Sequence, residues 1–299
     1  MFTGLSAFPL TPLDNDRFDE AAYAGLIARL ATAGVDSINA LGSTGSYAYL
    51  DRAERRRVAQ ATIAHSGETP VIVGIGALRT SQVKALAYDA QEAGADAVLL
   101  APVSYQSLTD EEVFSLYEEV TAELSVPLVV YDNPGTTHFT FSLDMYAQVA
   151  ALPNVAAIKI PPPTGISAAE QIAAIREVIP PRVHIGISGD PYAAAALSAG
   201  CDSWFSVIAG TLPEPALAIT RAAQNTDPDT AGPQAAHAES ARLEPVWELF
   251  AEHGSLRVTA AIAEHLGLVG PDCLPRPILG LSDPQRARVA QVIEDLNLR

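Results

Sequence analysis

Lysine is rare in this chain, so the two lysines are the first residues to consider for chemistry. Of 18 basic residues, 16 are Arg and only Lys84 and Lys159 are Lys. Lys159 lies in the apolar run NVAAIKI, where burial would disfavour the charged ammonium and lower its pKa. A neutral lysine amine can form an imine with a carbonyl substrate, which arginine cannot do. Lys159 is therefore a candidate nucleophile, with a buried lysine–carboxylate pair as the alternative. Lys84, in the helical pattern SQVKALAYDA, is expected on the solvated surface.

A tyrosine closes a second apolar run. Tyr131 ends VPLVVY and is followed by Asp-Asn-Pro-Gly, which predicts a turn. A phenol beside an imine-forming lysine can move the protons of addition and dehydration. The alternative is that Tyr131 caps an apolar core and takes no part in chemistry.

The stretch GSTGS at 42–46 has the composition of an anion-binding turn. Its glycines, including Gly45, let the backbone approach a ligand closely, and the hydroxyls of Ser43 and Thr44 can hold a carboxylate. A plain turn would use the same residue types, so both interpretations stay open. Gly189, in the SGD sequence, and Ser206 end two later apolar runs and carry the same ambiguity.

The sequence lacks the patterns of several other kinds of site. The six histidines are scattered without HxH or HExxH spacing, so no metal site is expected. There is no Walker loop and no GxSxG motif, and GIGALRT lacks the third glycine of a dinucleotide-binding turn. We therefore expect no cofactor.

Short apolar runs alternate with Ala-rich amphipathic stretches across most of the chain. Strands are expected at 4–10, 37–41, 70–75, 97–101, 127–131, 155–160, 182–187 and 203–207. Helices are expected near 19–33, 51–65, 80–93, 109–124, 142–151, 168–178, 190–199 and 212–223. Residues such as Asp51, Thr80, Thr109 and Asp190 are expected to cap some of these helices.

Strands that are apolar throughout are typical of parallel strands covered on both faces. Eight strand–helix units within about 225 residues most simply close as a (β/α)8 TIM barrel, with a doubly wound open sheet as the competing arrangement. In a barrel the strand ends share one face, so the candidate residues would meet there.

The pattern changes after about residue 225. NTDPDTAGPQ is a polar connector, and helices without strands are expected at 234–253, 255–266 and 284–296. We therefore divide the chain into a barrel, residues 1–225, which carries the active site, and a C-terminal helical extension, residues 226–299. We expect the extension to pack on the barrel and stiffen a subunit contact, rather than to act as a substrate lid.

The overall charge narrows the choice of partners. With 18 Lys plus Arg against 35 Asp plus Glu, the formal net charge is −17, which disfavours nucleic acid and anionic membrane surfaces as partners. Two cysteines fit a reducing compartment, and neither a secretory signal nor an apolar run of about 18 residues is present. We expect a soluble cytoplasmic enzyme.

The GxxG turn, the tyrosine followed by x-x-Pro and the Ile-Lys pair, in that order, resemble the dihydrodipicolinate synthase / N-acetylneuraminate lyase family. The resemblance covers nearly the whole chain. It implies a (β/α)8 barrel with a helical extension and a homo-oligomer, a tetramer or dimer. The activity it implies is that of a class I lyase, which binds pyruvate or another 2-keto acid as a lysine imine and takes an aldehyde as second substrate.

By position, the resemblance implies a role for each matching residue. Lys159 would form the imine, Tyr131 would transfer protons, and Ser43 and Thr44 would bind the carboxylate, with Thr44 also linking tyrosines in a proton relay. Tyr105 is the candidate for the second relay tyrosine, which in this family reaches in from a neighbouring subunit.

The sequence departs from the family where the second substrate would bind. Thr136 stands where dihydrodipicolinate synthases commonly carry an arginine that holds the aldehyde's carboxylate, Ser46 replaces a glutamate, and Ile160 replaces an acidic or polar residue. Arg79 and His138 are further candidates for substrate contact.

We therefore expect aldol condensation or cleavage, or dehydration, of a 2-keto-3-deoxy acid. Synthesis of 4-hydroxy-tetrahydrodipicolinate is the alternative reaction. A non-catalytic barrel that binds a keto acid or sugar acid is the alternative from another class.

Overall fold

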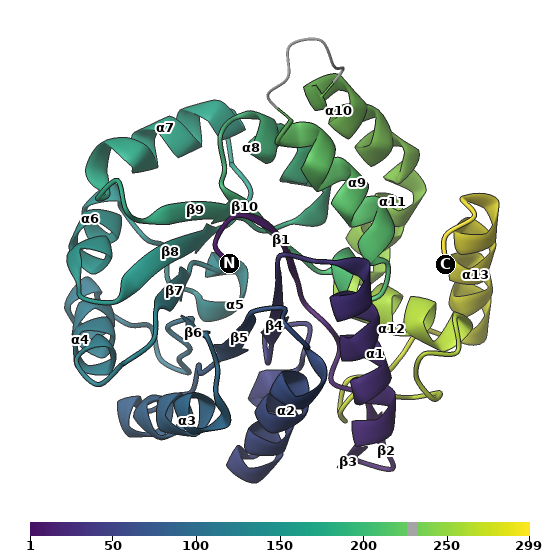
Figure 1. The fold of residues 1–299 in the computed structure, drawn as a ribbon, viewed down its shortest axis with the longest axis horizontal. Helices are drawn as coiled ribbons and strands as arrows, with labels where there is room; N and C mark the ends of the chain where they lie inside the picture. The colour runs from purple at the N-terminus through teal and green to yellow at the C-terminus, as the bar shows by residue number, and fades with distance from the viewer. Residues whose placement is uncertain (226–231) are drawn as a thin grey trace.

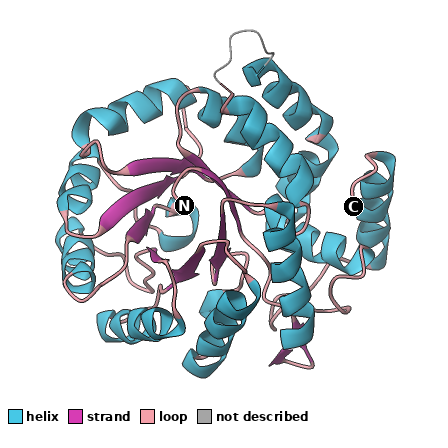
Figure 2. Ribbon diagram, in the orientation of Figure 1, coloured by secondary structure: helices cyan, strands magenta, loops and turns pink. Residues whose placement is uncertain are grey.

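The computed structural model describes residues 1–225 and 232–299, and its main feature is a closed barrel of parallel strands (Figures 1 and 2). Around the barrel the strands are β1 (Gly4–Ala7), β10 (Ser203–Ser206), β9 (His184–Ile187), β8 (Val155–Ile160), β7 (Leu128–Tyr131), β6 (Ala97–Leu100), β5 (Val71–Gly74) and β4 (Ser37–Ala40). Pairing of β1 with β4 closes the ring. The predicted (β/α)8 barrel is confirmed, and the open-sheet alternative is wrong.

The helices that follow the strands lie outside the barrel, as Figure 2 shows. They are α1 (Glu20–Ala33), α2 (Arg52–His65), α3 (Thr80–Ala93), α4 (Asp110–Thr121), α6 (Leu143–Ala151), α7 (Ala168–Val178), α8 (Ala193–Ser198) and α9 (Pro213–Ala223). Their positions match the amphipathic stretches of the sequence. Lys84 on α3 lies at the surface, as expected, and its ammonium pairs with Glu123 at 2.6 Å.

Some of the predicted helix caps are confirmed and others are wrong. Asp51 and Thr109 cap α2 and α4, each within a capping box. Arg79, rather than Thr80, precedes α3. Asp190 does not cap the helix that it begins with its own side chain. It begins the short 3-10 helix η2 (Asp190–Tyr192), and α8 starts three residues later than predicted.

Several short elements were not predicted. A two-stranded hairpin, β2 (Leu13–Asp14) with β3 (Arg17–Phe18), lies beside the barrel, and η1 (Tyr47–Tyr49) and η3 (Ile208–Gly210) follow β4 and β10. The turn predicted after Tyr131 is a short helix, α5 (Pro134–Thr137). Pro134 suits the first turn of this helix, because backbone N–H groups there have no partner within the helix and the N–H that proline lacks is not missed.

Apolar side chains cover both sides of the barrel wall. The larger cluster lies between the strands and the helices, and it includes Leu5, Ile38, Val130 and Ile158. A second cluster, formed by alternate residues of the same strands, fills the barrel with Phe8, Ile72, Leu99, Val129, Tyr131 and Phe205 among its members. Burial on both faces explains why the strand sequences are apolar throughout.

The C-terminal helices α10 (Gly232–Arg242), α11 (Glu244–His253), α12 (Ser255–His265) and α13 (Asp283–Asp295) run along one side of the barrel, next to α9 and α1 (Figure 1). The single helix predicted over 234–253 is wrong. It is two helices that meet at Leu243, because Pro245 lacks a backbone N–H and is placed in the first turn of α11. Apolar residues of α12, including Ala260 and Ala263, pack with Leu26 of α1. The connector predicted at 225–234 lies largely outside the described residues.

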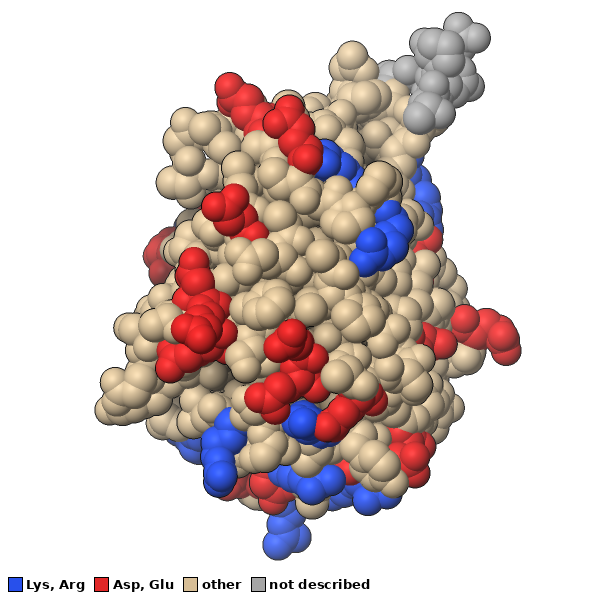
Figure 3. Space-filling model, turned by 90° about the vertical axis from the view of Figure 1, so that its left-hand side faces the viewer, with Lys and Arg blue, Asp and Glu red and all other residues tan. Residues whose placement is uncertain are grey.

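Charged side chains lie over much of the surface that Figure 3 shows. Asp and Glu side chains are spread over the face shown in Figure 3, with basic side chains among them. Within residues 1–225 and 232–299, no helix combines the length and apolar character needed to cross a bilayer.

Candidate active site

Lys159 and Tyr131 lie on neighbouring strands at the same level of the barrel. Their Cα atoms are paired in the β7–β8 register, and the backbone N–H of Asp132 donates to the Lys159 carbonyl at 3.0 Å. The Lys159 Nζ lies 4.0 Å from the centroid of the Tyr131 ring and 3.9 Å from that of Phe8. Phe205 adds a third ring at 5.6 Å. Strand pairing and aromatic packing therefore hold the amine in one place.

Burial controls the ionisation of Lys159. The residue is only 4% exposed, and desolvation lowers the pKa of its amine to about 7, although the carboxylate of Asp190 opposes the shift. Within the described parts of the chain, its Nζ has neither a hydrogen-bond partner nor an ion-pair partner. A large fraction of the amine is therefore neutral, and nucleophilic, near pH 7. The tight lysine–carboxylate pair, the alternative for Lys159, is not what the geometry shows.

The phenol of Tyr131 sits in a small hydrogen-bond network. Its hydroxyl lies 3.4 Å from the Ser43 Oγ and accepts a hydrogen bond from the Asn133 Nδ2 at 3.0 Å. Burial raises the pKa of Tyr131 to about 12, with the Ser43 contact opposing, so the phenol is protonated at neutral pH. A neutral amine and a protonated phenol thus lie next to one another.

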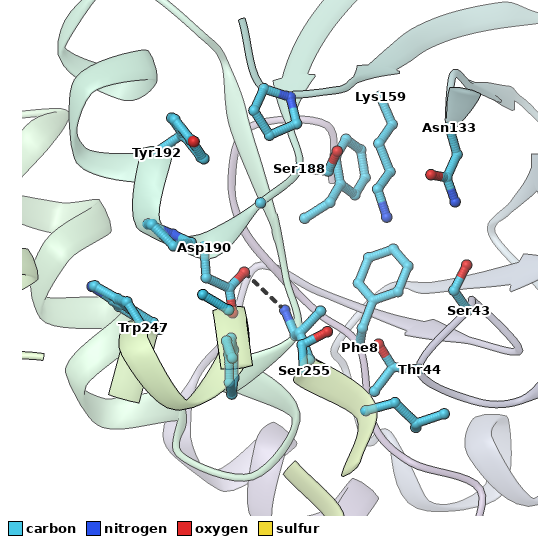
Figure 4. Close-up of a pocket in the computed structure, with 18 of the residues that line it drawn as sticks. Phe8, Ser43, Thr44, Asn133, Lys159, Ser188, Asp190, Tyr192, Trp247 and Ser255 are labelled. Atoms are coloured by element: carbon cyan, nitrogen blue, oxygen red, sulfur yellow. Dashed lines mark hydrogen bonds between the residues drawn. The ribbon is translucent and has the colours of Figure 1, made fainter. Parts of the chain in front are cut away.

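These groups line a cavity of about 760 Å³ (Figure 4). The predicted site residues that line it are Lys159, Tyr131, Ser43, Thr44, Thr136 and Gly189. They come from the ends of different strands or from the segments that follow them, including the short helix α5, which is where barrel enzymes place their active sites.

Five predicted residues do not line the cavity. Gly45 packs against the chain, where a Cβ would lie 3.1 Å from the Leu41 nitrogen, so its role is to form the turn. The Ser206 Oγ accepts a hydrogen bond from the Ala209 N–H at 3.1 Å, inside the protein. Tyr105 is 90% exposed, beyond the end of β6. Arg79 and His138 are also exposed and lie outside the lining.

Asp190 is a site residue whose role the sequence did not reveal. Its carboxylate accepts hydrogen bonds from the Trp204 Nε1 and from the backbone N–H groups of Val207 and Ile208. These bonds link the end of β9 to the end of β10. Burial, the largest influence, raises the pKa of Asp190 to about 6. The SGD sequence signalled a ligand-binding turn, but nothing in it indicated this bridge.

The C-terminal extension also contributes to the cavity. Glu244, Trp247 and Glu248 on α11 and Ser255 on α12 line its outer part. Asn133 was missed as well, although its place two residues after Tyr131 was a usable signal. The α11 residues had no such signal, because nothing in a helical sequence shows which face meets a distant barrel. In the parts of the chain that the structure describes, no three His, Cys, Asp or Glu side chains cluster as metal ligands.

The chain is similar to known proteins along nearly its whole length. The dihydrodipicolinate synthetase family model matches residues 1–296. The chain belongs to this family. A 4-hydroxy-tetrahydrodipicolinate synthase of Halorhodospira halophila is 31% identical over 305 residues, covering 100% of this chain and 98% of the relative. An uncharacterized DapA-like lyase of Halobacterium salinarum is 29% identical and covers 97% of this chain and 92% of its own.

The solved structures agree in fold. The crystal structure of a dihydrodipicolinate synthase from Agrobacterium tumefaciens superposes with a TM-score of 0.94 at 47% identity, over 99% of this chain and 98% of that one. The protein is therefore a lyase of the dihydrodipicolinate synthetase family, built as a TIM barrel with a C-terminal helical extension.

Proposed function

We propose that this lyase forms an imine between Lys159 and pyruvate or another 2-keto acid. The observation that carries the proposal is a buried amine whose pKa is lowered to about 7, held against the protonated phenol of Tyr131. A sensor that only binds keto acids has no use for a neutral amine in this position.

Four of the cavity residues have roles in this chemistry. The Lys159 nitrogen attacks the keto carbon. Tyr131 transfers protons to the former carbonyl oxygen, and that oxygen leaves as water. Ser43 and Thr44 hold the carboxylate. The protonated imine then withdraws electrons from the adjacent carbon, which can lose a proton and form a bond to the carbonyl carbon of a second compound, or break such a bond in the reverse reaction. In the dehydration, the adjacent carbon loses a proton and the hydroxyl on the next carbon leaves as water.

The second half of the reaction is aldol condensation or cleavage, or dehydration, of a 2-keto-3-deoxy acid. Thr136 lines the cavity at the position where the family's lysine-biosynthetic enzymes commonly carry an arginine. The alternative is 4-hydroxy-tetrahydrodipicolinate synthesis, for which relatives such as the H. halophila protein are named. An aldehyde with its own carboxylate would need a cation that the described lining does not offer apart from Lys159.

The exposed Tyr105 supports a homo-oligomer, either a dimer or a tetramer. Its ring is 90% exposed in a single chain, which is unusual for a tyrosine at the active-site end of a barrel. In the proposed assembly Tyr105 enters the cavity of a neighbouring copy and exchanges protons with Tyr131 through Thr44.

Reductive trapping tests the imine directly. The protein is incubated with pyruvate and borohydride, and its intact mass and peptide map are measured. One reduced pyruvate should be found on Lys159. The adduct should be lost in Lys159→Arg and kept in Lys84→Arg, which removes the only other lysine.

A chain that gains no adduct with either pyruvate or 2-keto-3-deoxygluconate would overturn the proposal. That result would favour the non-catalytic binding barrel.

A further inference from the structure

The outer part of the cavity carries two carboxylates that have no partner among the described residues. Glu244 and Glu248 line it from α11, four residues apart and therefore one helical turn from each other. Both are exposed, and neither side chain forms a hydrogen bond or ion pair within the described residues. Like charges at this spacing repel each other and weaken a helix. A ligand that interacts with them would give the pair a function.

Cations are missing from the described lining except at its inner end. Lys159 is the only Lys or Arg among the described residues that line the cavity, and the buried Asp190 adds a third carboxylate. A second substrate with a carboxylate or phosphate at its far end would therefore meet negative charge without a counterion.

The two ends of the cavity differ in chemistry, as Figure 4 shows. Ser43 and Thr44 lie on one side of it, with Lys159 pointing into the space beside them, whereas Tyr192 and Trp247 lie on the opposite side. The Trp247 indole N–H already donates to the Ser240 carbonyl at 2.9 Å, so the ring presents apolar surface rather than a free donor. Carboxylates only accept hydrogen bonds, so this end suits a ligand that supplies the donors.

A separate observation shows that the cavity is built to hold a ligand. Lys159 is only 4% exposed, and its amine points into the same space without a polar partner in the described residues. A buried amine without a partner is costly unless something in the cavity engages it. This observation does not depend on Glu244 or Glu248.

We propose that Glu244 and Glu248 determine the second-substrate class. They exclude an anionic carbonyl partner and accept hydrogen bonds from an uncharged, hydroxyl-bearing chain. Trp247 and Tyr192 pack against the carbon–hydrogen faces of that chain. This inference rests on the proposed imine chemistry, which supplies the first substrate and the reactive carbon.

Matched aldehydes test the inference. With saturating pyruvate, kcat/KM is measured for glycolaldehyde, D-glyceraldehyde and D-erythrose, and for their anionic counterparts glyoxylate, D-glyceraldehyde 3-phosphate and D-erythrose 4-phosphate. The uncharged member of each pair should be preferred by about fivefold or more, as expected for partly solvated charges. The preference should weaken as ionic strength rises.

Charge-neutral variants complete the test. In the Glu244→Gln/Glu248→Gln double variant, the preference should fall by about fivefold, because the repulsion is removed while the side-chain shape is kept. Glu68→Gln is the control, since it removes a negative charge from the exposed loop before β5, at the opposite end of the barrel, and should leave the preference unchanged.

Three results would overturn the inference: equal or better turnover of the anionic aldehydes, no turnover of any hydroxyaldehyde, or an unchanged preference in the double variant. Trapping of pyruvate on Lys159 needs no aldehyde and separates the two proposals. An adduct without charge selection removes only this inference, whereas the absence of an adduct removes the imine mechanism.

Discussion

Lys159 and Tyr131 lie on strands whose backbones are paired in register, whereas Glu244 and Glu248 reach the cavity from a helix of the C-terminal extension. The inner residues are buried and enclosed by Phe8 and Phe205, and the α11 glutamates are exposed. A group held by a hydrogen-bonded barrel cannot shift without disturbing neighbouring strands. A side chain on the C-terminal extension can be substituted with little effect on the barrel. This difference suggests that the inner end performs the chemistry and the outer end selects the substrate.

The largest effect should come from Tyr131→Phe, which keeps the ring against Lys159 and removes only the hydroxyl. We expect kcat to fall by about 10²–10⁴-fold, the usual contribution of a general acid–base group. If the two ends of the cavity are separable, the loss should be the same for every aldehyde. Steady-state kinetics with several aldehydes checks this, and circular dichroism confirms the fold. A loss confined to some aldehydes would show that Tyr131 also selects substrates.

Ser43→Ala should have a smaller effect, confined to the keto acid. Its hydroxyl lies 3.4 Å from the Tyr131 hydroxyl and faces the cavity. Loss of one hydrogen bond to a carboxylate should raise KM for pyruvate by about tenfold. KM for the aldehyde should stay the same, and Ser43→Thr, which keeps the hydroxyl, should restore much of the affinity. A change in aldehyde KM alone would place Ser43 at the wrong end of the cavity.

The same difference explains what the sequence predicted and what it missed. Lys159, Tyr131, Ser43 and Thr44 were found because each ends or follows an apolar strand, and closing the barrel brings strand ends together. Ser206 was assigned to the cavity on the same rule, but its hydroxyl is bonded inside the protein to Ala209. Position along a strand predicts the level of a residue in the barrel, and it does not determine the partner of its side chain.

The outer end of the cavity could not be predicted in this way. The position of α11 depends on how the extension packs against α9 and α1, which involves contacts between residues far apart in sequence. The break at Leu243 also divides into α10 and α11 what the pattern indicated as a single helix. Asp190 was missed for a similar reason, since its three hydrogen-bond donors come from the next strand and the loop after it.

Asn133→Ala should reduce kcat by about fivefold, because a single hydrogen bond to the Tyr131 hydroxyl is lost. Asn133 acts as a positioning residue for the phenol, so kcat should fall more than KM rises. The fall should again be equal for charged and uncharged aldehydes. A change in the preference between them would show that Asn133 contacts the second substrate. Catalysis and substrate selection would then not be confined to separate ends of the cavity.

The smallest effect expected is a shift in pH dependence. Imine formation needs the neutral amine of Lys159, whose pKa is about 7, so the rate of pyruvate trapping should rise with pH through that value and then level off. The Asp190 carboxylate raises this pKa, because a nearby negative charge favours the ammonium. In Asp190→Asn the pKa of Lys159 should therefore fall, and the midpoint of the trapping profile should move to lower pH.

Asp190→Asn also loses hydrogen bonds at the ends of β9 and β10, so its stability should fall by about 1–3 kcal/mol, and its fold is checked by thermal unfolding. Glu244→Gln is the matched comparison, since it removes a carboxylate from the exposed end of the same cavity. Water and salt screen that charge, so its midpoint should move less than that of Asp190→Asn. An equal shift in both variants would mean that the outer carboxylates act on Lys159 as strongly as the buried one, and the cavity would then work as a single electrostatic unit.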